Sequence, residues 1–297
     1  MRVAVVGLGA MGGGMARALL SAGHEVLGLD VDRARVAAFE DAGGLSGGLA
    51  GQVGALDGVV CVVLNATQTE AALWGDDGVA RALAQGGVIV SCATVPPAFA
   101  RAMADRAGAA GLLYLDAPIS GGAAKAASGD LSIMASGAPG AFAAARPLLD
   151  AMAATVFELG DAAGAGSAMK AVNQLLAGVH IAAMAEAMAF GVSQGIDPAR
   201  FMEVIPRCAG TSWMLEDRGA RLAAGDAAPR SAVDIWPKDL GIVADIAREA
   251  RVPVPLAAAA LQRFVAASGM GLGQADDSTV ARVYARDAGL SLPGDDA

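Results

Sequence analysis

The stretch "RVAVVGLGAMGGGMARALLSAGHEVLGLD", residues 2–30, decides the fold of the first half of the chain. Its pattern predicts a buried strand, a glycine-rich turn, a helix and a second strand, at residues 2–6, 7–12, 13–22 and 25–29. Gly23 is placed to end the helix, as glycine commonly does. A strand, turn, helix and strand at this spacing predict the first unit of a dinucleotide-binding fold.

The turn has the pattern G-x-G-x-x-G. Its six residues are Gly7, Leu8, Gly9, Ala10, Met11 and Gly12. The first glycine permits the tight turn, the second lets the backbone approach a pyrophosphate, and the third packs the helix against the strand. The helix N-terminus then offers amide groups to the phosphates. The pattern alone is a weak signal, but its position between a strand and a helix predicts a cofactor site.

Asp30 stands at the end of the second predicted strand, 18 positions after Gly12. A carboxylate there can accept hydrogen bonds from both ribose hydroxyls and would repel a 2′-phosphate. This favours NAD over NADP. Arg33 is the opposing feature, because an arginine just beyond the strand could cover a phosphate.

The rest of the first half continues the same alternation of strands and helices. Further strands are expected at residues 59–64, 87–90 and 112–115, which predicts a doubly wound, mostly parallel sheet. Residues 43–58 are glycine-rich, but their leucines and valine recur at helical spacing, so we expect a helix there. After about residue 160 the chain becomes rich in Ala, Met and Leu at helical spacing. We therefore expect an NAD-binding domain over 1–162 and an all-helical domain over 163–297.

Composition narrows the possible partners. The net charge of −9 speaks against nucleic acid and against anionic membranes. The chain is 55% hydrophobic, but its most apolar segment, residues 171–196, contains Asn, Gln, His and Glu, so we expect a buried helix and no membrane span. Three widely spaced cysteines predict free thiols in a reducing cytoplasm.

A lysine is the most prominent candidate for catalysis. Lys170 lies within the apolar stretch "GAGSAMKAVNQLLAG", residues 164–178. It could be a surface lysine with a buried stem, or a lysine kept dry so that it can lose its proton. Of the two histidines, His24 lies in a predicted turn and His180 on an apolar helix. No Cys/His cluster has metal-ligand spacing, so we expect no metal.

The neighbours of Lys170 favour a catalytic interpretation. In a helix, Lys170, Asn173 and Gln174 fall at i, i+3 and i+4 and share one face. Asn173 could orient the amine or hold a substrate hydroxyl. Burial and a positively charged nicotinamide ring would both favour the neutral amine, which is the form that acts as a base.

A second candidate element is "DAPISGGAAKAASGDLSIMASG", residues 116–137. It leaves a strand and turns through Ser120, Gly121 and Gly122. A hydroxyl followed by glycine amides suits a carboxylate. An ordinary strand-to-helix turn explains the same residues equally well.

Together these motifs resemble the β-hydroxyacid dehydrogenase family, which includes 3-hydroxyisobutyrate, tartronate semialdehyde and 6-phosphogluconate dehydrogenases. "GLGAMG" is similar to the cofactor motif, "DAPISGG" to the substrate motif and "GAGSAMKAVNQ" to the catalytic motif. "KDLG", residues 238–241, is similar to the C-terminal motif. The resemblance implies a Rossmann domain, a long interdomain helix, and an all-α domain that builds a homodimer or homotetramer.

The resemblance also implies roles for individual residues. Lys170 would be the general acid/base, Asn173 would support the reacting hydroxyl, and the Ser120-Gly121-Gly122 turn would bind the substrate carboxylate. Lys238 would lie close to both cofactor and substrate, and Asn65 and Thr94 would contact the cofactor. The chain has Ala93 where the family usually has serine, and Gln174 where many members have a second asparagine. Gln174 is expected on the substrate side.

Three stretches are most similar to a subgroup that oxidises the C2 hydroxyl of a four-carbon aldonate: "NQLLAGVHIAAMAEAMAFG", "AGTSWMLEDR" and "PRSAVDIWPKDLG". This similarity places Ser212 and Trp213 at the substrate, although Trp213 could also be an ordinary core residue. The alternatives are a 3-hydroxyisobutyrate or 2-hydroxy-3-oxopropionate (tartronate semialdehyde) dehydrogenase of the same family, an imine reductase of the same fold, and an NAD-binding sensor without activity. The expected partner is a small anionic hydroxy acid.

Overall fold

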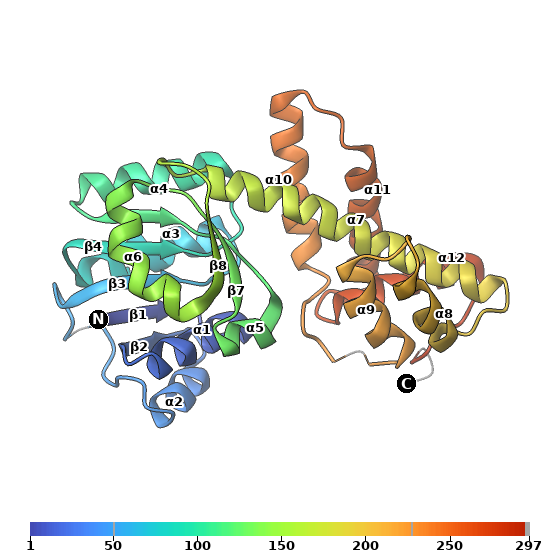
Figure 1. The fold of residues 1–297 in the computed structure, drawn as a ribbon, viewed down its shortest axis with the longest axis horizontal. Helices are drawn as coiled ribbons and strands as arrows, with labels where there is room; N and C mark the ends of the chain where they lie inside the picture. The colour runs from blue at the N-terminus through green and yellow to red at the C-terminus, as the bar shows by residue number, and fades with distance from the viewer. Residues whose placement is uncertain (50, 227, 295–297) are drawn as a thin grey trace. The chain divides into compact units, whose positions relative to one another are not determined.

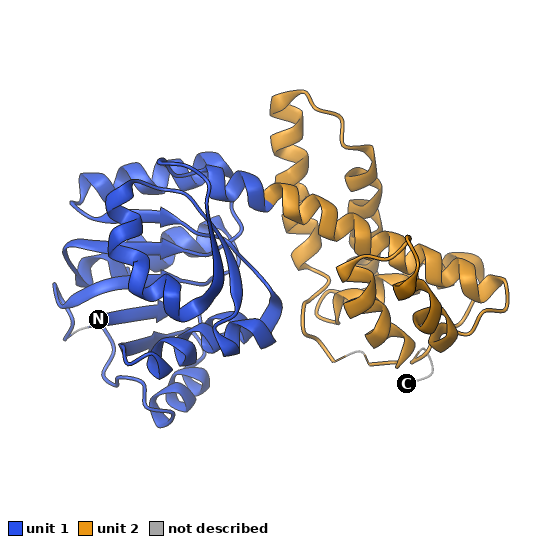
Figure 2. Cartoon of the chain, viewed as in Figure 1, with its two compact units in different colours: residues 1–170 blue, residues 171–297 orange. Residues whose placement is uncertain are grey.

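The computed structural model describes residues 1–49, 51–226 and 228–294 (Figure 1). The chain divides into two compact units, residues 1–170 and 171–297 (Figure 2). The division falls inside the long helix α7 (Ala165–Ser193), somewhat beyond the domain boundary expected between residues 162 and 163. The first residues of α7 belong to the first unit because the amides of Gly166 and Ser167 donate hydrogen bonds to Ser136 and Asp116 of that unit.

A five-stranded sheet forms the centre of the first unit, and all its strands are parallel. In spatial order they are β2 (Glu25–Leu29), β1 (Arg2–Val6), β3 (Leu56–Cys61), β4 (Leu83–Ser91) and β5 (Leu113–Asp116). The predicted strands at 2–6 and 25–29 are confirmed, and β3 begins and ends earlier in the chain than expected. The parallel sheet is the predicted one.

Helices cover both faces of this sheet. The helices of this unit are α1 (Ala10–Ser21), α2 (Arg33–Asp41), α3 (Ala66–Trp74), the 3₁₀ turn η1 (Val79–Ala82), α4 (Pro97–Ala109), α5 (Gly122–Ser128) and α6 (Pro139–Met152). Alternation along β1 shows the two faces: Val3 and Val5 pack in the cluster that contains α1 and α6, whereas Ala4 packs in the cluster that contains α3 and α4. Gly23 follows α1 with a positive φ of 85°, as predicted.

A second, three-stranded sheet follows the first along the chain and was not predicted from the sequence. Its strands are β6 (Ile119–Ser120), β7 (Leu131–Ala135) and β8 (Ala153–Glu158). β6 is antiparallel to β7, and β7 is parallel to β8. The sheet matters for function because β6 contains the first residue of the Ser-Gly-Gly turn.

The helix expected over residues 43–58 is wrong. The described part of this segment forms turns and bends, with one isolated bridge from Leu45 to Leu27, and its last residues already belong to β3. Ala50 lies outside the described residues. Four of its glycines have positive φ, which an α-helix excludes: Gly43, Gly47, Gly48 and Gly54. The conformational cost of placing these glycines in a helix therefore outweighs the helical spacing of the apolar residues.

The second unit is built from helices, as predicted. Besides the rest of α7 they are α8 (Pro198–Val204), α9 (Trp213–Ala223), α10 (Ile235–Ala250), α11 (Pro255–Ala267) and α12 (Ala281–Ala288), with the short turns η2 (Ile205–Arg207), η3 (Ser268–Leu272) and η4 (Asp277–Val280). Their apolar faces share one core, in which the Trp236 ring stacks on Phe264 at 5.4 Å.

Within the described residues, α7 is the one helix long and apolar enough to cross a membrane, judged by length and composition alone. Half of its most apolar window is buried in the protein. A core helix of a folded domain passes the same test.

Candidate functional site

Two glycines of the G-x-G-x-x-G turn are required by the fold itself. Gly7 has a φ of +91°, and a Cβ there would lie 2.3 Å from the carbonyl oxygen of Val62. A Cβ on Gly12 would lie 1.8 Å from the carbonyl oxygen of Gly7. Any side chain at either position would therefore displace β1, the turn or α1.

Gly9 is different, because the surrounding protein leaves room for a side chain at this position. A Cβ on Gly9 would meet only the Arg35 guanidinium, at 3.6 Å. Gly9 is also the N-cap of α1 and contributes no side-chain cap, so the first amides of the helix are left for another acceptor. An open position beside a helix N-terminus fits the pyrophosphate of a dinucleotide.

Asp30 holds this turn in place. Its carboxylate accepts hydrogen bonds from the amide of Leu8 at 2.6 Å and from the amide of Asp32 at 2.8 Å. A carboxylate has further lone pairs, so it can also accept from a ribose. The arginine beside Asp30 is Arg35, at 3.8 Å, whereas Arg33 is exposed at the start of α2. Arg35 was not predicted from the sequence.

The other predicted cofactor residues follow the carboxyl ends of β1, β3 and β4, which meet at one edge of the sheet. Leu8 is buried, Met11 is half-buried against the core, and Ala10 is exposed. Asn65 caps α3 by accepting the amide of Gln68 at 2.8 Å. Thr94 is half-buried in the loop after β4. The topology thus places these residues at the same edge of the sheet in the first unit, whereas Lys238, the remaining predicted cofactor residue, belongs to the second unit.

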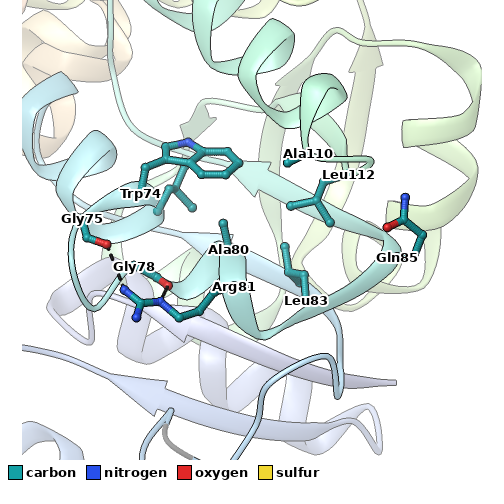
Figure 3. A pocket seen from close by; sticks show the side chains of 10 residues that line it. Trp74, Gly75, Gly78, Ala80, Arg81, Leu83, Gln85, Ala110 and Leu112 are labelled. Atoms are coloured by element: carbon teal, nitrogen blue, oxygen red, sulfur yellow. Dashed lines mark hydrogen bonds between the residues drawn. The ribbon is translucent and has the colours of Figure 1, made fainter.

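A cavity lies at the opposite edge of the same sheet, where β4 begins (Figure 3). Trp74 and Leu83 line it, and Arg81 donates hydrogen bonds to the carbonyl oxygens of Gly75 and Gly78. None of the predicted site residues lines this cavity. Arg81 holds the turn that follows α3, which is a structural role.

Lys170 is buried, so the surface interpretation of this residue is wrong. The residue is only 8% exposed, and its Nζ donates a hydrogen bond to the carbonyl oxygen of Ile119 at 2.8 Å. Ile119 directly precedes Ser120. The structure therefore brings the candidate base to the predicted carboxylate loop, from a position 51 residues further along the chain.

The backbone of that loop depends on its glycines. Gly121 has a φ of 140° and Gly122 a φ of 78°, both in the range that favours glycine. Ser120 stands opposite Ser132 in the β6–β7 pair and is half-buried. The turn thus carries a hydroxyl and successive amides directly after Ile119, whose carbonyl oxygen contacts the Lys170 amine. Such donors suit an anionic oxygen.

Asp116, the first residue of "DAPISGG", anchors the start of α7. Its buried carboxylate accepts the amides of Gly164 and Ser167, each at 2.9 Å, and the hydroxyl of Ser167 at 2.7 Å. Burial raises the pKa of this carboxyl, and the hydrogen bonds from Ser167 and Gly164 oppose the shift. Asp116 was visible within its motif, but this role was not predicted from the sequence. Asp116 and Ile119 of this motif therefore both contact the segment that contains Lys170.

In the second unit, three predicted residues meet through one that was missed. The Asn173 amide donates to Gln174 Oε1 at 2.9 Å, and Gln174 Nε2 donates to the carboxylate of Asp239. Lys238 Nζ lies 2.6 Å from the other Asp239 oxygen. Asp239 is 2% exposed. Its position in the quoted "KDLG" motif was the signal that could have identified it.

Ser212 and Trp213 form the start of α9. The Ser212 hydroxyl accepts the amide of Leu215 at 3.1 Å and so caps the helix. Trp213 is 54% exposed, with the Arg218 guanidinium 5.9 Å from its ring, so the core interpretation of this tryptophan is wrong. His180 is half-buried on α7. Within the described residues, no group of three His, Cys, Asp or Glu side chains could hold a metal ion.

Comparison with known proteins gives two family matches that cover most of the chain. Residues 2–160 match the model of the NAD binding domain of 6-phosphogluconate dehydrogenase. Residues 164–284 match the model described as NAD-binding of NADP-dependent 3-hydroxyisobutyrate dehydrogenase.

Individual relatives agree with these matches. The chain is 49% identical to an L-threonate dehydrogenase of Cupriavidus necator, over 98% of each chain. It is 36% identical to a 2-(hydroxymethyl)glutarate dehydrogenase of Eubacterium barkeri, over 99% of this chain and 98% of the relative. A solved structure from Salmonella typhimurium, described as a 3-hydroxyisobutyrate dehydrogenase, is 44% identical with a TM-score of 0.90, over 95% of this chain and 99% of the other.

Proposed function

Because the chain belongs to the β-hydroxyacid dehydrogenase family and is an NAD-dependent dehydrogenase, we propose that it oxidises L-threonate at the C2 hydroxyl. The product is the corresponding 2-oxo acid, and Lys170 is the general acid/base. The observation that carries the proposal is the buried amine of Lys170, 2.8 Å from the carbonyl oxygen of Ile119 and beside the Ser120 turn.

Lys170 accounts for the proton in this reaction. NAD, when bound, accepts the hydride from C2. The neutral amine of Lys170 takes the proton of the C2 hydroxyl as that hydroxyl becomes a carbonyl, and in the reverse direction it returns the proton. The contact with Ile119 restricts the amine to the neighbourhood of the carboxylate loop, which supplies orientation as well as basicity.

Ser120, Gly121 and Gly122 bind the carboxylate of the hydroxy acid in this proposal. The Ser120 hydroxyl and the loop amides donate to its oxygens, as donors grouped in a turn commonly do for an anion. The acid is then held one carbon away from the carbon that loses hydride. Asn173, in the turn of α7 after Lys170, supports the hydroxyl groups.

The choice of substrate rests on the relatives. Five relatives at 42–49% identity over nearly the full chain are L-threonate dehydrogenases. The Salmonella structure at 44% identity keeps 3-hydroxyisobutyrate as the second candidate. Tartronate semialdehyde is the third, by the family resemblance alone. Likeness to imine reductases at 20–24% identity concerns the fold only.

A substrate panel tests this proposal. With purified protein and NAD, we expect kcat/KM for L-threonate to exceed that for 3-hydroxyisobutyrate and lactate by about 10⁴-fold, because a site built for extra hydroxyls leaves polar groups unpaired when they are missing. Formation of NADH, followed by absorbance, measures it. Equal or better use of 3-hydroxyisobutyrate would reassign the substrate, whereas no NADH with any hydroxy acid would reject the reaction.

We also propose that the protein self-associates through α7. Four large apolar side chains of this helix are 44–67% exposed: Met169, Val172, Leu176 and Phe190. An exposed apolar stripe of this kind is typical of a protein interface. Light scattering should give the mass of a dimer or tetramer, and Phe190→Glu should lower it. A monomeric parent protein at micromolar concentration would contradict self-association.

A further inference from the structure

We propose that Asp239 is a positioning residue that sets the amide orientation of Asn173 through Gln174. Asn173 is thereby oriented to hydrogen-bond two adjacent hydroxyl groups of the substrate. This inference rests on the proposed function, because it assigns Asn173 to the substrate. Asp239 itself lies two hydrogen bonds beyond Asn173, with Gln174 between them. Its carboxylate contacts Gln174 of α7 and Lys238 of α10, so predicted site residues from two helices meet in one cluster.

The direction of each hydrogen bond follows from the carboxylate. An ionised carboxylate only accepts, and one of its oxygens already faces the ammonium group of Lys238 at 2.6 Å. Gln174 must therefore present its NH₂ group to the other oxygen. The Gln174 amide oxygen then points to Asn173 and accepts from Nδ2 at 2.9 Å.

The consequence for Asn173 is a defined set of remaining groups. One N–H of its amide is used by Gln174, so the carbonyl oxygen and the second N–H remain. An amide that offers one acceptor and one donor matches two neighbouring hydroxyls, one of which donates while the other accepts. The ligand class is a hydroxy acid with a vicinal diol. An acid with a methyl group at the second position offers no such pair.

Close packing of α7 on α10 makes the link rigid. A Cβ on Gly178 of α7 would lie 3.0 Å from both terminal carbons of Leu240, the residue after Asp239. Trp236, one turn before Leu240, is 2% exposed and packs in the same core. The two helices therefore approach closely where the hydrogen bonds cross, and both Gln174 and Asp239 are buried there.

The test is a cycle of two substitutions that exchange donor and acceptor. In Asp239→Asn the new amide no longer dictates the orientation of Gln174, and in Gln174→Glu two carboxylates face each other. We expect each to lower kcat/KM for L-threonate about 10–100-fold, the usual effect of one misplaced hydrogen bond to a charged group. The double variant, Asp239→Asn with Gln174→Glu, restores a donor opposite an acceptor and keeps Asn173 as donor to residue 174. Its kcat/KM for L-threonate should be at least about tenfold higher than that of the less active single variant.

The controls separate positioning from folding and from the choice of substrate. Asp245→Asn, on an exposed part of α10, should leave kcat/KM unchanged. Gln174→Met removes the link without adding charge and should lower kcat/KM by the same factor as the single variants. It takes the place of Gln174→Glu if that variant folds poorly. The affinity for NAD should be unchanged in the Gln174 variants, which keep the ion pair between Lys238 and Asp239. Selectivity for L-threonate over 2-hydroxybutyrate should fall in the single variants.

Two results would overturn the inference. One is a double variant whose fold-loss in kcat/KM equals the product of the fold-losses of the two single variants, and the other is an Asp239→Asn protein with unchanged kcat/KM. Failure of the substrate proposal gives a different result, since the parent protein would then be inactive on L-threonate. The cycle is in that case measured with the best hydroxy acid of the panel, and the same two outcomes decide it.

Discussion

Lys170→Met should reduce kcat about 10²–10⁴-fold, the range for the loss of a positioned acid/base, while NAD binding stays nearly unchanged. Methionine has a similar length and suits a position that is only 8% exposed, so the substitution removes the amine without opening a cavity. The predicted cofactor contacts lie at the glycine turn after β1 and should not be affected. Steady-state kinetics and a direct NAD titration measure the two quantities.

Two further variants make this result specific. Lys170→Arg keeps a positive charge but cannot lose its proton, so it should be about as inactive as Lys170→Met. Arg146→Met, at an exposed position of α6, replaces a cation in the same unit and should keep full activity. A Lys170→Met protein with a third of the parental kcat would remove Lys170 from the mechanism.

Asp277→Ala should lower the free energy of unfolding by about 3–5 kcal/mol, the usual cost of breaking a buried ion pair. The Asp277 carboxylate is fully buried and accepts two hydrogen bonds from Arg218, at 3.1 and 3.2 Å, and one from the Trp236 indole at 2.9 Å. Alanine leaves the guanidinium of Arg218 buried with Asp217 as its remaining carboxylate partner. Urea denaturation, followed by circular dichroism, measures the change.

The matched control is an ion pair of the same type on the surface. Asp245 pairs with Arg248 on α10, and both side chains are more than half exposed. Asp245→Ala should leave the denaturation midpoint unchanged, because solvent screens exposed pairs. If Asp277→Ala shifted the midpoint as little as Asp245→Ala, the buried pair would not contribute to stability in the way proposed.

Local pattern accounts for the part of the molecule that could be predicted. The G-x-G-x-x-G turn, the helix after it and the strands on either side depend on contacts between residues close in the chain, and the structure has them at the expected places. The long helix over Lys170 and Asn173 was likewise evident from its composition. The same reasoning failed over residues 43–58, because apolar spacing says nothing about which glycines have positive φ.

The sequence by itself determined the parallel sheet and the helical second unit, and it singled out Lys170 as the candidate acid/base. Tertiary structure decided which groups those residues meet: Lys170 and Ile119 are 51 positions apart, and Gln174 and Asp239 are 65 apart. Asp116 and Asp239 were visible as letters of quoted motifs, but their roles were not. The physical reason is that helices and turns are stabilised by hydrogen bonds within a few residues, whereas a buried side chain finds its partner only when distant segments pack together.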